Sequence, residues 1–141
     1  MSKILKLLSS SLLLTILSTN YVFAANDYFR CDRLSASSHG FKKSLQNDPN
    51  ALNRAFPVEL KIVIAADRSW AASYYGVQRD RSRNFRNNDI IKTKNGFQIY
   101  GKNLRTTGKV NVTYKSGGMK TGSPAYYQCD KALKTQWEPE G

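Results

Sequence analysis

The alternation of apolar and polar residues is clearest between positions 57 and 76, PVELKIVIAADRSWAASYYG, where it runs longest. Apolar residues occupy every second position at its start: Val58, Leu60, Ile62 and Ile64. Because successive side chains of a strand point to opposite faces, this alternation predicts a half-buried strand. A polar turn over residues 66–69 follows, and a return strand resumes the alternation at Trp70, Ala72 and Tyr74. A two-stranded ribbon is only marginally stable in water, so this hairpin requires other strands packed over it.

A second hairpin is predicted over residues 89–100, DIIKTKNGFQIY, in which Asn95-Gly96 is a strong turn signal. The register of this hairpin follows from the requirement that its apolar residues share one face. A two-residue turn would place Lys92 opposite Ile99, which mixes the faces. A three-residue loop over residues 94–96 instead places Ile91 opposite Ile99 and Thr93 opposite Phe97. We therefore expect the longer loop, with Gly96 in the left-handed conformation.

The remaining segments predict further short strands and one helix. Strands are expected over residues 109–115 and 125–130, and loops over residues 34–40 and 116–124. Residues 77–88 are expected to be an exposed loop or the polar end of a hairpin. Asp48 as N-cap and Pro49 at the first helical position predict a helix from Pro49 to Phe56. With about six or seven short strands, the chain is expected to be mainly β. The predicted fold is a small antiparallel sheet curled into a barrel or sandwich, with one short helix.

The first 24 residues have the composition of a secretory signal peptide. Lys3 and Lys6 give a positive start, an apolar run continues to Leu17, and residues 22–24, Val-Phe-Ala, suit a signal peptidase. The apolar run is shorter than the roughly 20 residues that a membrane span needs. We therefore expect cleavage after Ala24. Residues 25–141 would then form a single β-rich domain, periplasmic or secreted, with no transmembrane segment.

Two cysteines lie near the ends of the expected exported domain. Cys31 follows the cleavage point closely, and Cys129 lies twelve residues before the C-terminus. In an oxidising compartment the simplest arrangement is one disulfide between them, which would close the domain. Free thiols or an intermolecular bridge are the alternative. The flanking residues 28–33 and 126–131 are similar, so we expect the first and last strands to lie side by side or to be cross-linked between sheets.

The sequence contains few candidate catalytic residues. The single histidine, His39, lies in a serine-rich loop where no motif places a partner, and a lone loop histidine is more often a bystander. Metal binding needs three or four convergent ligands, which one histidine and two oxidised cysteines do not supply. No catalytic residue, metal or cofactor is predicted, which favours a non-enzymatic protein. A small secreted nuclease that uses His39, Glu59 and an arginine is the enzymatic alternative.

Charge is the most informative feature of the composition. Of the 22 lysines and arginines two lie in the leader, so the 117 exported residues carry 20 basic and 10 acidic side chains, a net charge of +10. Such a domain attracts anionic partners. Guanidinium groups bind phosphates and carboxylates bidentately, and aromatic rings stack on bases or sugars. Both types gather in one region, as anion-binding candidates Arg79, Arg81, Arg83 and Arg86 and stacking candidates Phe85, Trp70, Tyr74 and Tyr75.

These residues predict a small exported protein that binds an anionic partner without catalysis. Acidic polysaccharide, lipid headgroups and nucleic acid are the candidate partners. Two other interpretations stay open. The arginine run is a solvated basic loop if Asp80 and Asp89 pair with some of its members. Alternatively, the protein is a protein-binding envelope module or inhibitor whose partner is acidic. The sequence leaves the identity of the ligand and the oligomeric state open.

Overall fold

The computed structural model describes residues 25–114 and 123–137. The predicted signal peptide, most of the predicted connection over residues 116–124 and the last four residues lie outside the described part of the chain. None of the helices in the described ranges has the length and hydrophobicity needed to span a bilayer.

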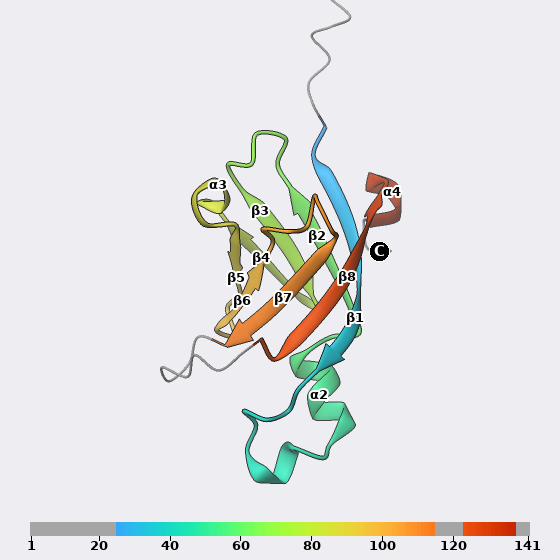
Figure 1. The fold of residues 1–141 in the computed structure, drawn as a ribbon, viewed down its shortest axis with the longest axis vertical. Helices are drawn as coiled ribbons and strands as arrows, with labels where there is room; N and C mark the ends of the chain where they lie inside the picture. The colour runs from blue at the N-terminus through green and yellow to red at the C-terminus, as the bar shows by residue number, and fades with distance from the viewer. Residues whose placement is uncertain (1–24, 115–122, 138–141) are drawn as a thin grey trace, which may run out of the picture.

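Eight antiparallel strands form one sheet within the described residues (Figure 1). The elements in chain order are β1 (Asp27–Ala36), η1 (Lys43–Leu45), α2 (Pro49–Ala55), β2 (Glu59–Ile64), β3 (Ala71–Tyr75), β4 (Gln78–Ser82), α3 (Phe85–Asn88), β5 (Ile90–Lys92), β6 (Phe97–Tyr100), β7 (Lys109–Tyr114), β8 (Ala125–Ala132) and α4 (Lys134–Trp137). The strand order is β4-β3-β2-β1-β8-β7-β6-β5, so strands that follow one another in the chain are paired, except β4 and β5, and the first strand pairs with the last. The sheet curls into a nearly closed barrel, as the apolar pattern predicted.

The barrel closes at a seam between β4 and β5, the two ends of the sheet order. Side-chain oxygens of β4 accept hydrogen bonds from backbone amides of the β5 hairpin across this seam. Ser82 Oγ accepts from the Lys92 amide at 2.9 Å, and Asp80 Oδ1 accepts from the Lys94 amide at 3.0 Å. These bonds take the place of the backbone-to-backbone hydrogen bonds of an ordinary strand pair, so side chains of β4 hold the seam together.

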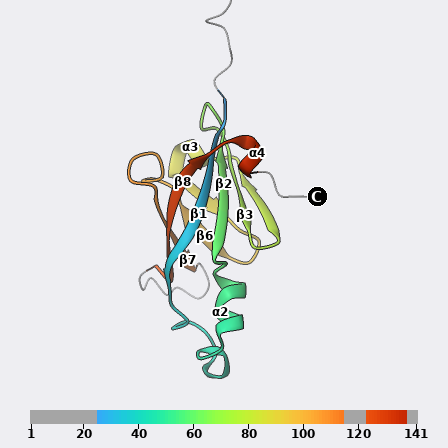
Figure 2. The ribbon, with the colours of Figure 1, turned by 90° about the vertical axis from the view of Figure 1, so that its right-hand side faces the viewer.

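Side chains fill the barrel interior. Alternate residues of the strands point inward and are almost fully buried, among them Leu60, Ile62, Ile64, Ile91, Ile99, Val110, Val112 and Tyr127. Helix α2 lies at one end of the barrel (Figure 2). Phe56, the residue after α2, is fully buried, and its ring centroid lies 5.4 Å from that of Phe97 in an edge-to-face geometry. The Tyr127 hydroxyl donates to the Pro57 carbonyl at 2.6 Å, and the Tyr75 hydroxyl donates to the Ala55 carbonyl. The interior is therefore a packed core.

Three local predictions are confirmed. Helix α2 begins where expected, because Asp48 caps it by accepting from the Asn50 amide at 2.9 Å. In the second hairpin Ile91 lies opposite Ile99, and Gly96 has φ +85°. The Thr93 amide also donates to the Phe97 carbonyl at 2.9 Å, as the three-residue loop requires.

The predicted disulfide is also confirmed. Cys31 of β1 and Cys129 of β8 lie directly opposite each other in the strand register and are bonded. The first and last strands therefore lie side by side, and the bond joins neighbouring strands of one sheet.

An exposed loop, one of the two forms expected for residues 77–88, is wrong, whereas the hairpin alternative is right in part because β4 pairs with β3. This segment forms β4 and α3, which raises the strand count to eight. The strand lacked an apolar stripe because arginines occupy its outer face while Asp80 faces inward, with 7% of its surface exposed. Backbone pairing with β3 stabilises it instead, in a register that sets Arg79 opposite Tyr74 and Arg81 opposite Ala72. The loop expected from residue 34 begins later, because β1 continues through an irregularity to Ala36.

Candidate anion-binding surface

Strands β3 and β4 place two arginines over two aromatic rings on the outer face of the barrel. The guanidinium carbon of Arg79 lies 4.5 Å from the ring centroid of Tyr74, its cross-strand partner. The guanidinium carbon of Arg81 lies 4.2 Å from the ring centroid of Trp70, which comes just before β3. Arg79 and Arg81 share one face because they are two residues apart on a strand.

The stacking restrains both guanidinium groups while both arginines stay exposed to solvent. A cation–π contact at an exposed site contributes about 0.5–1 kcal/mol. A guanidinium that lies flat on a ring still has its N–H edge available, and that edge binds carboxylate or phosphate bidentately. The rings of Tyr74 and Trp70 therefore restrain the guanidinium groups of Arg79 and Arg81.

Trp137 of α4 supports the same surface. Helix α4 lies outside the barrel wall beside β1 (Figure 1). The Trp137 ring centroid lies 4.8 Å from that of Tyr74 and 5.4 Å from that of Tyr28, with an edge-to-face geometry at both. Trp137 is 7% exposed. Tyr74 thus contacts Arg79 and Trp137, and its orientation is fixed by both.

A hollow of about 230 Å³ lies at the seam of the barrel. We call it the seam hollow. Residues at the end of β4, in α3 and in β5 line it: Arg81, Ser82, Arg83, Asn84, Asn88, Ile90 and Lys92. Three of these side chains are cationic and none is acidic. The hollow adjoins the stacked arginines, because Arg81 belongs to both.

Nearby carboxylates are engaged elsewhere. Asp89 forms an ion pair with Arg68, and Asp80 faces the interior, where it accepts from the Lys94 amide. The expectation that Asp80 and Asp89 pair with arginines of the cluster is therefore wrong. In the two described ranges Arg79, Arg81 and Arg83 form no ion pair.

Arg86 differs from the other three arginines of the cluster. Its Nε donates to the Asp67 carbonyl at 3.1 Å, and its Nη2 lies 3.9 Å from Asp67 Oδ2. Hydrogen bonds from the Ser69 hydroxyl and amide lower the pKa of the Asp67 carboxyl, and Arg86 adds a smaller effect in the same direction. Arg86 thus ties α3 to the β2–β3 turn.

Two of the four proposed stacking residues lie inside the protein. Phe85 is fully buried and Tyr75 is 3% exposed, so neither ring can reach a ligand, and this part of the prediction is wrong. Both face inward because the curl of the sheet encloses their positions. Trp70 and Tyr74 do lie on the outer face, where arginines cover their rings.

Four residues that line the seam hollow were not among the predicted site residues: Ser82, Asn84, Asn88 and Lys92. Their sequence signal was weak, since Lys92 sits in a hairpin that was interpreted only for its register. Lys92 lines the same hollow as Arg81 only because the curl of the sheet brings β5 beside β4.

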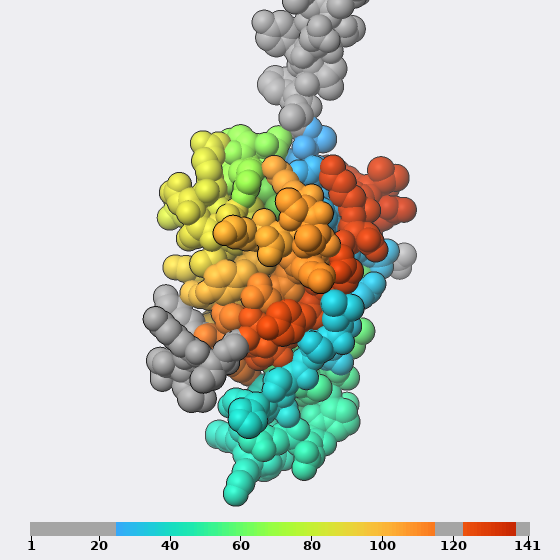
Figure 3. Space-filling view, viewed as in Figure 1, coloured from blue at the N-terminus to red at the C-terminus, as the bar shows by residue number. Residues whose placement is uncertain are grey.

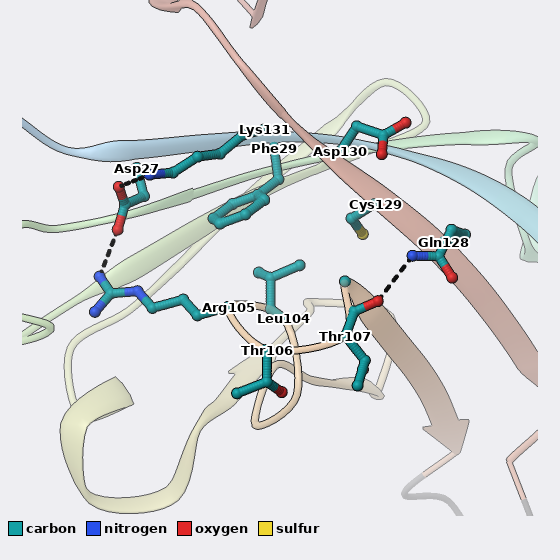
Figure 4. Close-up of a pocket in the computed structure, with 11 residues that line it drawn as sticks. Asp27, Phe29, Leu104, Arg105, Thr106, Thr107, Gln128, Cys129, Asp130 and Lys131 are labelled. Atoms are coloured by element: carbon teal, nitrogen blue, oxygen red, sulfur yellow. Dashed lines mark hydrogen bonds and ion pairs between the residues drawn. The ribbon is translucent and has the colours of Figure 1, made fainter.

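A larger groove of about 470 Å³ lies where the loop between β6 and β7 meets β1 and β8 (Figure 4). In the space-filling view this orange loop lies next to the red strand β8 (Figure 3). Gly108 allows the close approach, since it has φ +72° and an added Cβ would lie 2.5 Å from the Cys129 carbonyl oxygen. The groove's cations already share a carboxylate: Asp27 lies 2.7 Å from Arg105 Nη2 and 3.4 Å from Lys131 Nζ. The seam hollow is therefore better suited to bind an external anion.

Within the described ranges no hydrogen bond or ion pair joins His39 to Glu59, the two residues named for the nuclease alternative. His39 is exposed, and its backbone amide donates to Ser37 Oγ at 3.2 Å. Glu59 forms a hydrogen-bonded ion pair with Arg30 at 2.8 Å on the outer wall of β1 and β2. Among the described residues no group of three or more His, Cys, Asp or Glu side chains is placed to hold a metal.

Comparison of the chain with protein-family models, with curated proteins and with solved structures finds no match.

Proposed function

We propose that this protein binds an anionic partner without catalysis, through the outer surface of β3 and β4 and the adjoining seam hollow. One observation carries the proposal. Arg79, Arg81, Arg83 and Lys92 are all exposed, and none of them has an ion-pair partner among the described residues. Cations gathered in this way raise the local concentration of anions and speed their association.

The charge of the whole chain acts in the same direction. The full sequence has a net charge of +12. Acidic polysaccharide, an anionic lipid surface and nucleic acid are the partner classes that this charge favours. Export to the periplasm or outside the cell, which belongs to this proposal, would bring the protein to cell-surface polymers and lipids.

The aromatic rings have a supporting role in this proposal. Since arginines cover the rings of Trp70 and Tyr74, an incoming base or sugar finds guanidinium edges rather than free ring faces. Recognition then depends on charge and on N–H donors, and it should depend little on the bases of a nucleic acid.

Retention on heparin and binding to single-stranded DNA across a salt series test the proposal. The affinity should fall steeply with salt, because binding to a polyanion releases counterions. Arg81→Gln/Arg83→Gln should weaken binding to both ligands. The matched control is Lys42→Gln/Lys43→Gln, which removes two charges from exposed positions in and beside η1 at the other end of the molecule (Figure 1).

Equal loss in both double variants would mean that only net charge matters, and it would remove the assigned surface. Binding that is indifferent to salt would contradict an electrostatic partner. In that case an acidic protein partner, the main alternative, becomes the better hypothesis.

A further inference from the structure

We infer that the seam hollow is a binding site for a single tetrahedral oxyanion, a phosphate or sulfate group carried by the anionic partner. This inference rests on the proposed function and deepens it by naming the chemical group and the residues that hold it. The site includes Asn88 and Lys92, which lie outside the arginine run, and Ser82, which lies within it.

The charges that line the hollow are of one sign. Arg81 and Arg83 reach it from the end of β4, and Lys92 reaches it from β5. The acidic residues nearest in the chain, Asp80 and Asp89, are engaged on other sides of the same elements. A doubly charged oxyanion would therefore meet three cations without a competing carboxylate in the lining.

The neutral lining residues also offer donors. Ser82 Oγ already accepts from the Lys92 amide at 2.9 Å, so its O–H is left to donate. Asn88 Oδ1 accepts from the Ile90 amide at 3.1 Å, so its NH₂ group is left to donate. Phosphate and sulfate oxygens accept hydrogen bonds, and bonds from ionised donors are the strongest of these. The hollow therefore suits an oxyanion better than a ligand rich in donors.

The size of the hollow favours one group rather than a whole small molecule. Sites for drug-sized ligands measure roughly 300–1,000 Å³, and the seam hollow measures about 230 Å³. Its walls are also fixed before binding. The Trp70 ring restrains Arg81, the seam hydrogen bonds hold β5 to β4, and the fully buried Phe85 anchors α3. Less ordering is then required when the anion binds.

The test is a titration of the purified protein with inorganic phosphate and, separately, with inorganic sulfate, followed by amide chemical shifts in NMR spectra. Saturable shifts are expected at residues 81–92. Lys92→Gln should weaken the binding about tenfold, since a charge-assisted hydrogen bond is lost, and Arg83→Gln should act similarly. Lys94→Gln is the matched control: it removes an exposed charge two residues away that does not line the hollow. Tighter binding of phosphate would assign the site to phosphate esters, and tighter binding of sulfate would assign it to sulfate esters.

Two results would overturn the inference: no saturable shift with either anion, or equal weakening by Lys92→Gln and Lys94→Gln. If retention on heparin still depended on salt in either case, the proposed function would be retained, with Arg79 and Arg81 as the binding residues. Loss of both phosphate binding and heparin retention would remove the proposed function as well.

Discussion

The Lys94 amide donates a 3.0 Å hydrogen bond to Oδ1 of Asp80, which joins the β5–β6 turn to the middle of β4. Asp80 is an inward-facing residue on an otherwise basic strand. The Asp80–Lys94 and Ser82–Lys92 hydrogen bonds together join β4 to the β5 hairpin, and β4 and β5 are the two edge strands of the sheet. The side chains that close the barrel therefore also set the width of the seam hollow.

Asp80→Ala should destabilise the protein by about 1–3 kcal/mol, because the partly buried Lys94 amide loses its acceptor. Urea denaturation measures this change. Asp80→Asn retains one oxygen acceptor and should stay closer to the unchanged protein. Asp32→Ala is the control for charge, since Asp32 is exposed on β1. Equal stability of Asp80→Ala and Asp32→Ala would show that the seam bond contributes nothing.

Removing the disulfide should cost about 4–5 kcal/mol in the chain-entropy model, because Cys31 and Cys129 are 98 residues apart in the chain. Urea denaturation of Cys31→Ala/Cys129→Ala beside the unchanged protein gives the difference. A reductant should lower the stability of the unchanged protein and leave the double variant unaffected. A destabilisation well under 2 kcal/mol would mean that the unfolded chain is already compact enough to make the cross-link redundant.

Stability should fall as the pH rises above about 10. Burial raises the pKa of Tyr75 and of Tyr127 far above the ordinary tyrosine value. In the unfolded chain both lose a proton near pH 10 while the folded protein keeps both, so their stabilisation is complete below pH 10 and is lost above it. Two such groups lower the free energy of unfolding by about 2.7 kcal/mol per pH unit.

Urea denaturation between about pH 9 and pH 11 tests this dependence. Tyr127→Phe should make the slope shallower, since one of the buried tyrosines with a raised pKa is removed. Tyr126→Phe is the matched control, because Tyr126 is next to Tyr127 in the chain but its side chain is exposed on the outer face of β8. An identical slope for Tyr127→Phe and Tyr126→Phe would contradict the assignment to the buried rings.

Tyr74→Leu should weaken heparin binding at fixed salt by about two- to fivefold, because the Arg79 guanidinium loses the ring that restrains it. The charge is unchanged, so the slope of log affinity against log salt should stay the same. Arg79→Gln should weaken binding and also flatten that slope, because one ionic contact is lost. A flattened slope in Tyr74→Leu would mean that the ring does more than orient the arginine.

Much of the fold was predictable from local patterns. The alternation in β2 and β3 and the capped start of α2 were visible in the sequence, and so was the loop at Gly96. Strand β4 was not, since its residues are polar on both faces and only its pairing with β3 reveals it. The candidate site was predicted in part. Arg79, Arg81 and Arg83 do share an exposed surface, whereas Phe85 and Tyr75 belong to the core.

The sequence by itself determined most of the strand-forming segments and the basic character of the domain, and it favoured the pairing of the two cysteines. These features depend on periodicity, turn chemistry and composition, which act over a few residues or over the whole chain. Only the tertiary structure decided that Lys92 lies beside Arg81 and Arg83, and that Tyr74 and Trp70 carry arginines on their rings. Those contacts join separate strands, and they form because a curling sheet must bring its two outermost strands together to bury its apolar face.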